Sequence, residues 1–267
     1  MTETRLVKAL LRLATAGVLA FLYLPIVVLA IYAFNSSRIQ AWPPSSFTLQ
    51  WFVEASNNPL IIRALTNSLI AATIATTVAL VLGTLASLAV SRYDFFGRYT
   101  ISFFLLLPIA LPGVISGIAL RTTFTTFGVD LGLMTIIIGH ATFCVVVVYN
   151  NVLARLRRLP PSAEEASADL GADSFTTFRR VTMAGIGTAL VSGGLLAFGL
   201  SFDEIIVTIF TAGAGTQTLP MWIYAAIQRP NELPVVNVVA LVLVVISVIP
   251  VYLASRISSD VAGARQL

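Results

Sequence analysis

Two adjacent acidic residues, Asp203 and Glu204, follow Ser201 in the otherwise apolar run "LLAFGLSFDEIIVTIF". A carboxylate in such a run can offset the dehydration of a cation, and ionisable residues inside membrane helices usually face a bundle interior or a water-filled pathway. Both acids could instead lie in water if the helix ended before them. The residues alone leave both interpretations open, with Asp203, Glu204 and Ser201 as candidate pathway residues.

The other reactive side chains do not form a catalytic pattern. His140 is the single histidine, and without acidic neighbours in sequence it is better suited to hydrogen bonding inside a bundle than to a proton relay. The chain has no His-Glu-x-x-His, no Ser–His pair and no nucleotide-binding G-x-x-x-x-G-K-[ST] pattern. We therefore expect no catalytic residue, no metal ligand and no cofactor in this chain. An intramembrane enzyme is the alternative from another functional class.

The elements that position these residues must lie in lipid. Of 267 residues, 57% are hydrophobic and 10% are charged, whereas soluble domains carry about 25% charged residues. Pro108 and Pro112 predict a kink in one apolar run. A spanning helix needs about 20 apolar residues, which predicts spans at about 14–34, 65–90, 101–120, 131–153, 189–210 and 235–254. We expect an all-α membrane protein with six transmembrane helices in a single domain, 1–267.

Basic residues are distributed unevenly between the segments that link these runs. Lys and Arg accumulate on the cytoplasmic side of a membrane. If the N-terminus is inside, the outer segments contain only four of the 16 Lys and Arg residues, namely Arg38, Arg63, Arg121 and Arg229. This bias predicts that the N- and C-termini and the segment 160–185 are cytoplasmic.

The segment 160–185, "PPSAEEASADLGADSFTTFRRVTMAG", is polar and has the pattern of two short helices. Gly171 stands where the first helix would end with a positive φ, and the second would begin near Asp173. Phe175 and Phe178 are three residues apart and predict an apolar face. Such a segment could bind in a groove of another protein or pack on its own helices, and the residues alone do not decide between the two.

The same segment resembles the EAA loop of ABC importer permeases. That pattern is Glu-Ala-Ala, three residues, Gly, nine residues and Ile-x-Leu-Pro. Here "EAS" at 165–167 is followed by Gly171 and by "VTMA" at 181–184 with matching spacing. Ser, Met and Ala replace the Ala, Leu and Pro of the pattern. The missing proline, at Ala184, bears on how the loop joins the fifth run.

In that family the loop docks into a separate cytoplasmic ATPase and transmits its closure to the membrane. The resemblance implies a MetI-like fold in a multi-pass protein of the bacterial inner membrane. The resemblance also implies the partners of this chain: membrane lipid, a dimer of an ABC ATPase, a second homologous permease subunit, and a periplasmic or lipid-anchored substrate-binding protein. The ATPase would bind the ATP and Mg²⁺. No nucleic acid is implied. The implied coupling residues are Glu164, Glu165, Ala166, Ser167, Asp169, Gly171, Ala172, Phe175, Phe178 and Val181.

Other stretches, including "YLPIVVLAIYAFNSS", "LSFDEIIVTIFTAG" and "TLPMWIY", are similar to permeases of spermidine/putrescine importers. This similarity implies a polyamine substrate and a core of two different permease chains, and it favours the pathway interpretation of Asp203. Other small amines, such as γ-aminobutyrate or an opine, are alternative substrates. An ion-coupled carrier is a further alternative class, but it would lack the coupling loop and would often contain inverted repeats.

Overall fold

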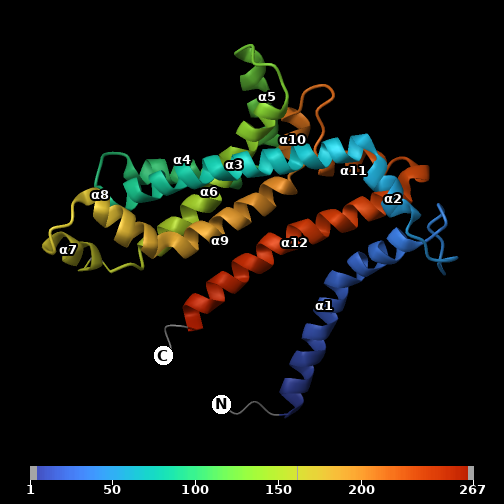
Figure 1. Cartoon of the computed structure of the whole chain (residues 1–267), viewed down its shortest axis with the longest axis horizontal. Coiled ribbons are helices and arrows are strands. Elements are labelled where there is room, and N and C mark those ends of the chain that lie inside the picture. The colour runs from blue at the N-terminus through green and yellow to red at the C-terminus, as the bar shows by residue number, and fades with distance from the viewer. Residues whose placement is uncertain (1–4, 161, 264–267) are drawn as a thin grey trace. The chain divides into compact units, whose positions relative to one another are not determined.

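The computed structural model describes residues 5–160 and 162–263, and its helices are labelled in Figure 1. Five helical segments in these ranges are long and apolar enough to cross a membrane, or up to six if one bent pair counts as a span. The expected all-α architecture is therefore confirmed. The helices are α1 (Arg5–Phe34), α2 (Gln50–Asn57), α3 (Pro59–Arg92), α4 (Arg98–Ala110), α5 (Gly113–Thr126), α6 (Leu133–Leu156), α7 (Ser162–Asp169), α8 (Ser174–Thr177), α9 (Met183–Phe202), α10 (Ile206–Thr211), α11 (Leu219–Ala226) and α12 (Leu233–Gly263).

The described residues form two compact units. The first contains the residues up to Ile62 together with Trp222–Val245, and the second contains Arg63–Met221 and the residues from Ile246 onward. In the first unit, the buried Trp51 donates its indole N–H to the carbonyl oxygen of Asn35 at 2.7 Å, which ties α2 to the segment that follows α1. Both candidate functional regions lie in the second unit.

α3, α6 and α9 run beside one another in the second unit (Figure 1). Gly83 allows a close approach of α3 and α6, because a Cβ atom there would lie 2.9 Å from the carbonyl oxygen of Val145. The buried Ser87 hydroxyl donates to the Tyr149 carbonyl oxygen at 2.9 Å. Small residues and hydroxyl hydrogen bonds are the usual means by which membrane helices pack. The core cluster is Ala79, Phe143, Cys144, Val148, Val152, Leu156, Ile186, Ala197 and Val207.

The third predicted span, 101–120, is not one helix. α4 and α5 are separated at Leu111 and Pro112, and their axes differ by 106°. Proline disfavours a helical conformation in the residue before it, and Leu111 is extended, with ψ of 142°. Figure 1 shows α5 turning away from the line of α4. The prolines thus produce a full break where the sequence predicts a kink.

The fifth predicted span, 189–210, is also interrupted. α9 ends at Phe202 and α10 begins at Ile206, so Asp203 and Glu204 lie in the break. The Glu204 carboxylate accepts a hydrogen bond from the backbone N–H of Val207 at 2.9 Å. This bond satisfies one of the free donors in the first turn of α10, because the first N–H groups of a helix have no partner within it.

Candidate functional site

The segment between α6 and α9 folds as two short helices around a glycine turn. Gly171 has a φ of +81°, which confirms the turn predicted there, and the next N–H, of Ala172, donates to the Ser167 carbonyl oxygen at 3.1 Å. Asp173 then caps α8, with its carboxylate accepting from the backbone N–H of Thr176 at 2.8 Å. The turn and the cap fix how α8 leaves α7.

The cap on α8 is stronger when the Asp173 carboxylate is ionised. Hydrogen bonds from the side chain and the backbone of Thr176 lower the pKa of Asp173, because they stabilise the charged form. An unfolded aspartate has a pKa of about 3.9. The cap's contribution is therefore complete above that value and is lost as pH falls through the lowered pKa. Near neutral pH this part of the loop keeps its geometry.

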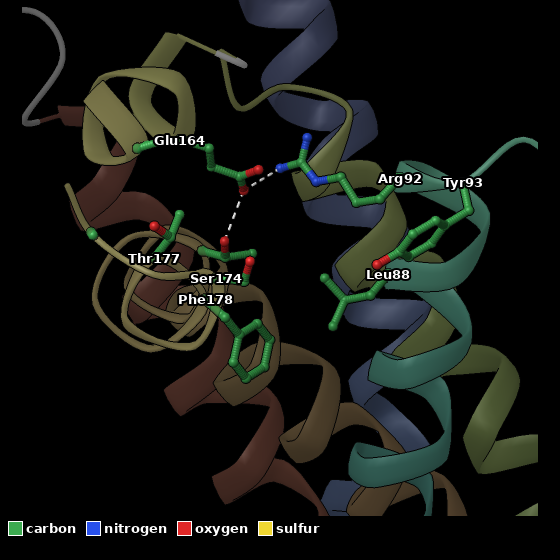
Figure 2. A pocket seen from close by; sticks show the side chains of 10 residues that line it. Leu88, Arg92, Tyr93, Glu164, Ser174, Thr177 and Phe178 are labelled. Atoms are coloured by element: carbon green, nitrogen blue, oxygen red, sulfur yellow. Dashed lines mark hydrogen bonds and ion pairs between the residues drawn. The ribbon is translucent and has the colours of Figure 1, made fainter. Parts of the chain in front are cut away.

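One face of the loop lies against the ends of α3 and α9 (Figure 2). The Glu164 carboxylate accepts from the Arg92 guanidinium at 2.5 Å and from the Thr182 hydroxyl at 2.8 Å. The hydroxyls of Ser167 and Thr177 lie 2.9 Å apart and join α7 to α8. A cavity of about 360 Å³ remains beside these contacts. Its lining includes Leu88, Tyr93, Ala168, Ala172, Ser174 and Phe178.

The loop also exposes two large apolar side chains. Leu170 is 89% exposed and Phe175 is 69% exposed, and Glu165, Ala166 and Asp169 of α7 are exposed as well. Large exposed apolar side chains on a polar segment are a feature of surfaces that bind another protein. We call Leu170 and Phe175 the apolar tip of the loop.

Phe178 does not share the exposed face that its spacing from Phe175 predicts. It is half-buried and lines the cavity with Leu88. After α8 the chain forms a π-helical turn, Phe178–Thr182, which contains the half-buried Val181 and continues directly into α9. Ala184 is an ordinary helical position in α9, and alanine, unlike proline, supports a helix there. The loop therefore joins α9 without a break.

A second candidate site lies where the two interrupted helices meet. A Cβ atom at Gly113, the first residue of α5, would lie 3.2 Å from Ile206, and one at Gly117 would lie 2.5 Å from Phe210. The beginning of α5 therefore packs directly on α10. Non-helical backbone at membrane depth is tolerated where protein buries it or where it lines a water-filled cavity, and helix breaks of this kind form substrate sites in transporters.

The three candidate pathway residues have different surroundings. Asp203 is exposed, and within residues 5–160 and 162–263 its carboxylate has no hydrogen-bond or ion-pair partner. Glu204 is half-buried and caps α10. The buried Ser201 hydroxyl lies 2.8 Å from Nδ1 of His140, whose Nε2 lies 2.8 Å from the Thr208 hydroxyl. α9 ends before the two acids and Asp203 is exposed, so the condition for the water-facing interpretation is met, and the free carboxylate is accessible to a cation there. Ser201 and His140 instead hold α6, α9 and α10 together.

Three residues of these regions are absent from the sequence-based site. In the sequence, Arg92 is one basic residue beside an apolar run, and its partner Glu164 lies 72 positions away. Thr182 lies in the EAA pattern only as a variable position. Leu170 precedes the turn glycine, and the one available signal was an apolar residue in a polar segment.

Comparisons with known proteins place these features in one family. Residues 79–263 match the family model described as binding-protein-dependent transport system inner membrane component. The spermidine/putrescine transport system permease protein PotC of Escherichia coli K12 is 33% identical over 245 residues, covering 91% of this chain and 92% of the relative. The putrescine transport system permease protein PotI of the same strain is 36% identical over 228 residues, covering 82% and 80%.

The fold agrees with that match. A solved bacterial ABC transporter that imports the acidic polysaccharide alginate contains a chain with a TM-score of 0.74 and 17% identity to this one, covering 96% of this chain and 95% of the other. Identity this low supports the fold and not the substrate. The chain therefore belongs to the family of inner membrane components of binding-protein-dependent transport systems, as a permease subunit of an ABC importer and not an enzyme.

Proposed function

We propose that this permease subunit imports a polyamine such as putrescine or spermidine. The observation that carries the proposal is the free carboxylate of Asp203 at the break between α9 and α10. α5 packs on α10, the helix that follows the break. A polyamine carries separated ammonium groups, and a carboxylate on the pathway offsets the cost of removing their hydration. The identity to PotC and PotI over most of the chain supports the same substrate class.

The substrate is tested by uptake in a strain that lacks its own polyamine importers. The complete importer is expressed, and initial uptake of labelled putrescine, spermidine, γ-aminobutyrate and an opine is measured. We expect uptake of a polyamine and not of the two zwitterions, because one carboxylate favours a cation without a carboxylate of its own. Uptake of γ-aminobutyrate or the opine in preference to both polyamines would contradict the polyamine assignment while leaving the permease role intact.

The proposal includes an orientation and an assembly in the inner membrane. The positive-inside bias supports cytoplasmic termini and a cytoplasmic loop between α6 and α9. The exposed apolar tip, Leu170 and Phe175, then faces a dimer of ABC ATPase subunits, which bind the ATP and Mg²⁺. A second, homologous but different permease subunit completes the pathway, and a periplasmic or lipid-anchored binding protein delivers the substrate from the other side.

The orientation is tested by labelling introduced cysteines with a membrane-impermeant maleimide. Gln40→Cys, between α1 and α2, and Asp169→Cys, in the loop, are both at exposed positions. The single native cysteine, Cys144, is buried and gives a low background. We expect labelling of Gln40→Cys in spheroplasts and of Asp169→Cys only in inverted vesicles. The reverse pattern would place the loop outside and remove the proposed ATPase contact.

A further inference from the structure

Glu164 joins three segments that are distant in sequence. It lies in the first turn of α7, and its carboxylate is held by Arg92, the last residue of α3, and by Thr182, the last residue of the π-helical turn before α9. Both bonds end on the same carboxylate oxygen. We call these three residues the clasp.

The clasp is stronger than an ordinary surface ion pair. The side chains of Arg92 and Glu164 are only 28% and 26% exposed, so water screens their attraction less than that of a fully exposed pair. A hydrogen bond between ionised partners is also stronger than one between neutral groups, and the Arg92 guanidinium donates to the Glu164 carboxylate. Figure 2 shows the dashed line that joins the Glu164 carboxylate to the Arg92 guanidinium and a second one that joins it to a hydroxyl group.

The surroundings of the clasp leave room for movement. A cavity of about 360 Å³ separates parts of α7 and α8 from the end of α3, so close packing does not hold the loop there as it holds a protein interior. The π-helical turn contains wider hydrogen-bonded rings than an α-helix, and such turns are frequent at functional sites. The loop is thus attached at the clasp and loosely packed beside it.

From this geometry we propose that Arg92, Glu164 and Thr182 transmit the movement of the loop to α3 and α9 during transport. The proposal rests on the proposed docking of the loop to the ATPase. A displacement of α7 acts through one carboxylate on α3 and on α9, and α9 ends at the break that holds Asp203. Glu164 and Arg92 are positioning residues, because they act through α3 and α9.

The test uses the complete importer reconstituted in lipid vesicles with its binding protein. Glu164→Gln and Arg92→Gln are each expected to lower substrate-stimulated ATP hydrolysis and uptake about tenfold, the scale of a typical coupling between sites. The amount of ATPase that copurifies is expected to stay at the wild-type level, because the exposed tip is unchanged. Asp94→Asn, which removes a 95% exposed partner of Arg98 two positions from Arg92, is the matched control and is expected to behave as wild type.

Restoration of the pair separates transmission from simple damage to the fold. Combining Arg92→Glu with Glu164→Arg is expected to recover a substantial part of the stimulated activity lost in the two single reversals, since only the reversed pair can re-form the contact. Thr182→Val provides a second variant with both charges intact and is expected to lower uptake per ATP hydrolysed.

Three results distinguish transmission through the clasp from a role of these residues in docking. Wild-type stimulation in both glutamine variants would overturn the clasp, and so would loss of ATPase copurification, because the pair would then only shape the docking surface. Failure of the unmodified importer to copurify with an ATPase would instead contradict the proposed docking itself.

Discussion

Asp203→Asn is expected to lower polyamine uptake at low substrate concentration about ten- to a hundredfold, with unchanged levels of the chain in the membrane. The Asp203 carboxylate is exposed at a helix break and has no partner among the described residues. A hydrogen bond to a charged group contributes about 1.5–3 kcal/mol, and each 1.4 kcal/mol corresponds to about a factor of ten. The asparagine amide keeps the shape but loses the charge that binds ammonium. Initial rates with labelled putrescine, normalised by immunoblot, measure the effect.

Two variants at the same break provide the controls. Asp203→Glu keeps the charge and is expected to lose less activity than Asp203→Asn. Glu204→Gln keeps an amide oxygen that can accept the Val207 N–H, so α10 retains its cap and uptake is expected to fall only slightly. Normal uptake by Asp203→Asn would remove this residue from the pathway. A larger loss in Glu204→Gln than in Asp203→Asn would transfer the pathway role to Glu204.

The helical membrane fold could be predicted from the sequence because lipid leaves few options. Backbone groups in hydrocarbon must be satisfied within the segment, so an apolar run of sufficient length predicts a helix whatever it packs against. The helices extend beyond the predicted runs, as α1 does by beginning at Arg5 and α12 by continuing to Gly263. Polar residues at helix ends lower hydropathy without ending the backbone hydrogen bonding, which is why hydropathy underestimates these lengths.

The helix breaks depend on information that hydropathy does not contain. Pro112 marks its own break, although the 106° angle also reflects how α5 packs on α10 through Gly117. The break after Phe202 has no proline or glycine to announce it. There the carboxylate of Glu204 accepts the hydrogen bond from the N–H of Val207, in place of a backbone carbonyl oxygen. Such a competition between side chain and backbone is possible in many sequences, so the residues alone do not predict it.

In the loop, too, features set by neighbouring residues could be predicted, and features set by contacts with distant residues could not. Gly171 could be predicted because a positive φ is a local requirement. The orientation of Phe178 could not, because it depends on the end of α3, about 90 residues earlier in the chain. For the same reason the contact of Arg92 with Glu164 is visible only in the folded chain.

Removing the apolar tip is expected to release the ATPase. In Leu170→Ala combined with Phe175→Ala, the affinity of the permease for the ATPase should fall at least about tenfold, because burying one large apolar side chain contributes about 1.5–3 kcal/mol and two are removed. Both side chains are mostly exposed in the isolated chain, so the fold should lose little stability. Binding of labelled ATPase to the permease in lipid nanodiscs measures the affinity, and uptake should fall in parallel.

The control is Phe96→Ala, which removes one fully exposed phenylalanine side chain between α3 and α4. Because Phe96 lies outside the loop, its removal is expected to leave the ATPase affinity unchanged. An equal loss of affinity in both variants would mean that the ATPase contacts a broad apolar surface and not this tip. Unchanged affinity with lost uptake would mean that Leu170 and Phe175 act after docking, and the contact that binds the ATPase would then have to come from the exposed polar side chains of α7, Glu165 and Asp169.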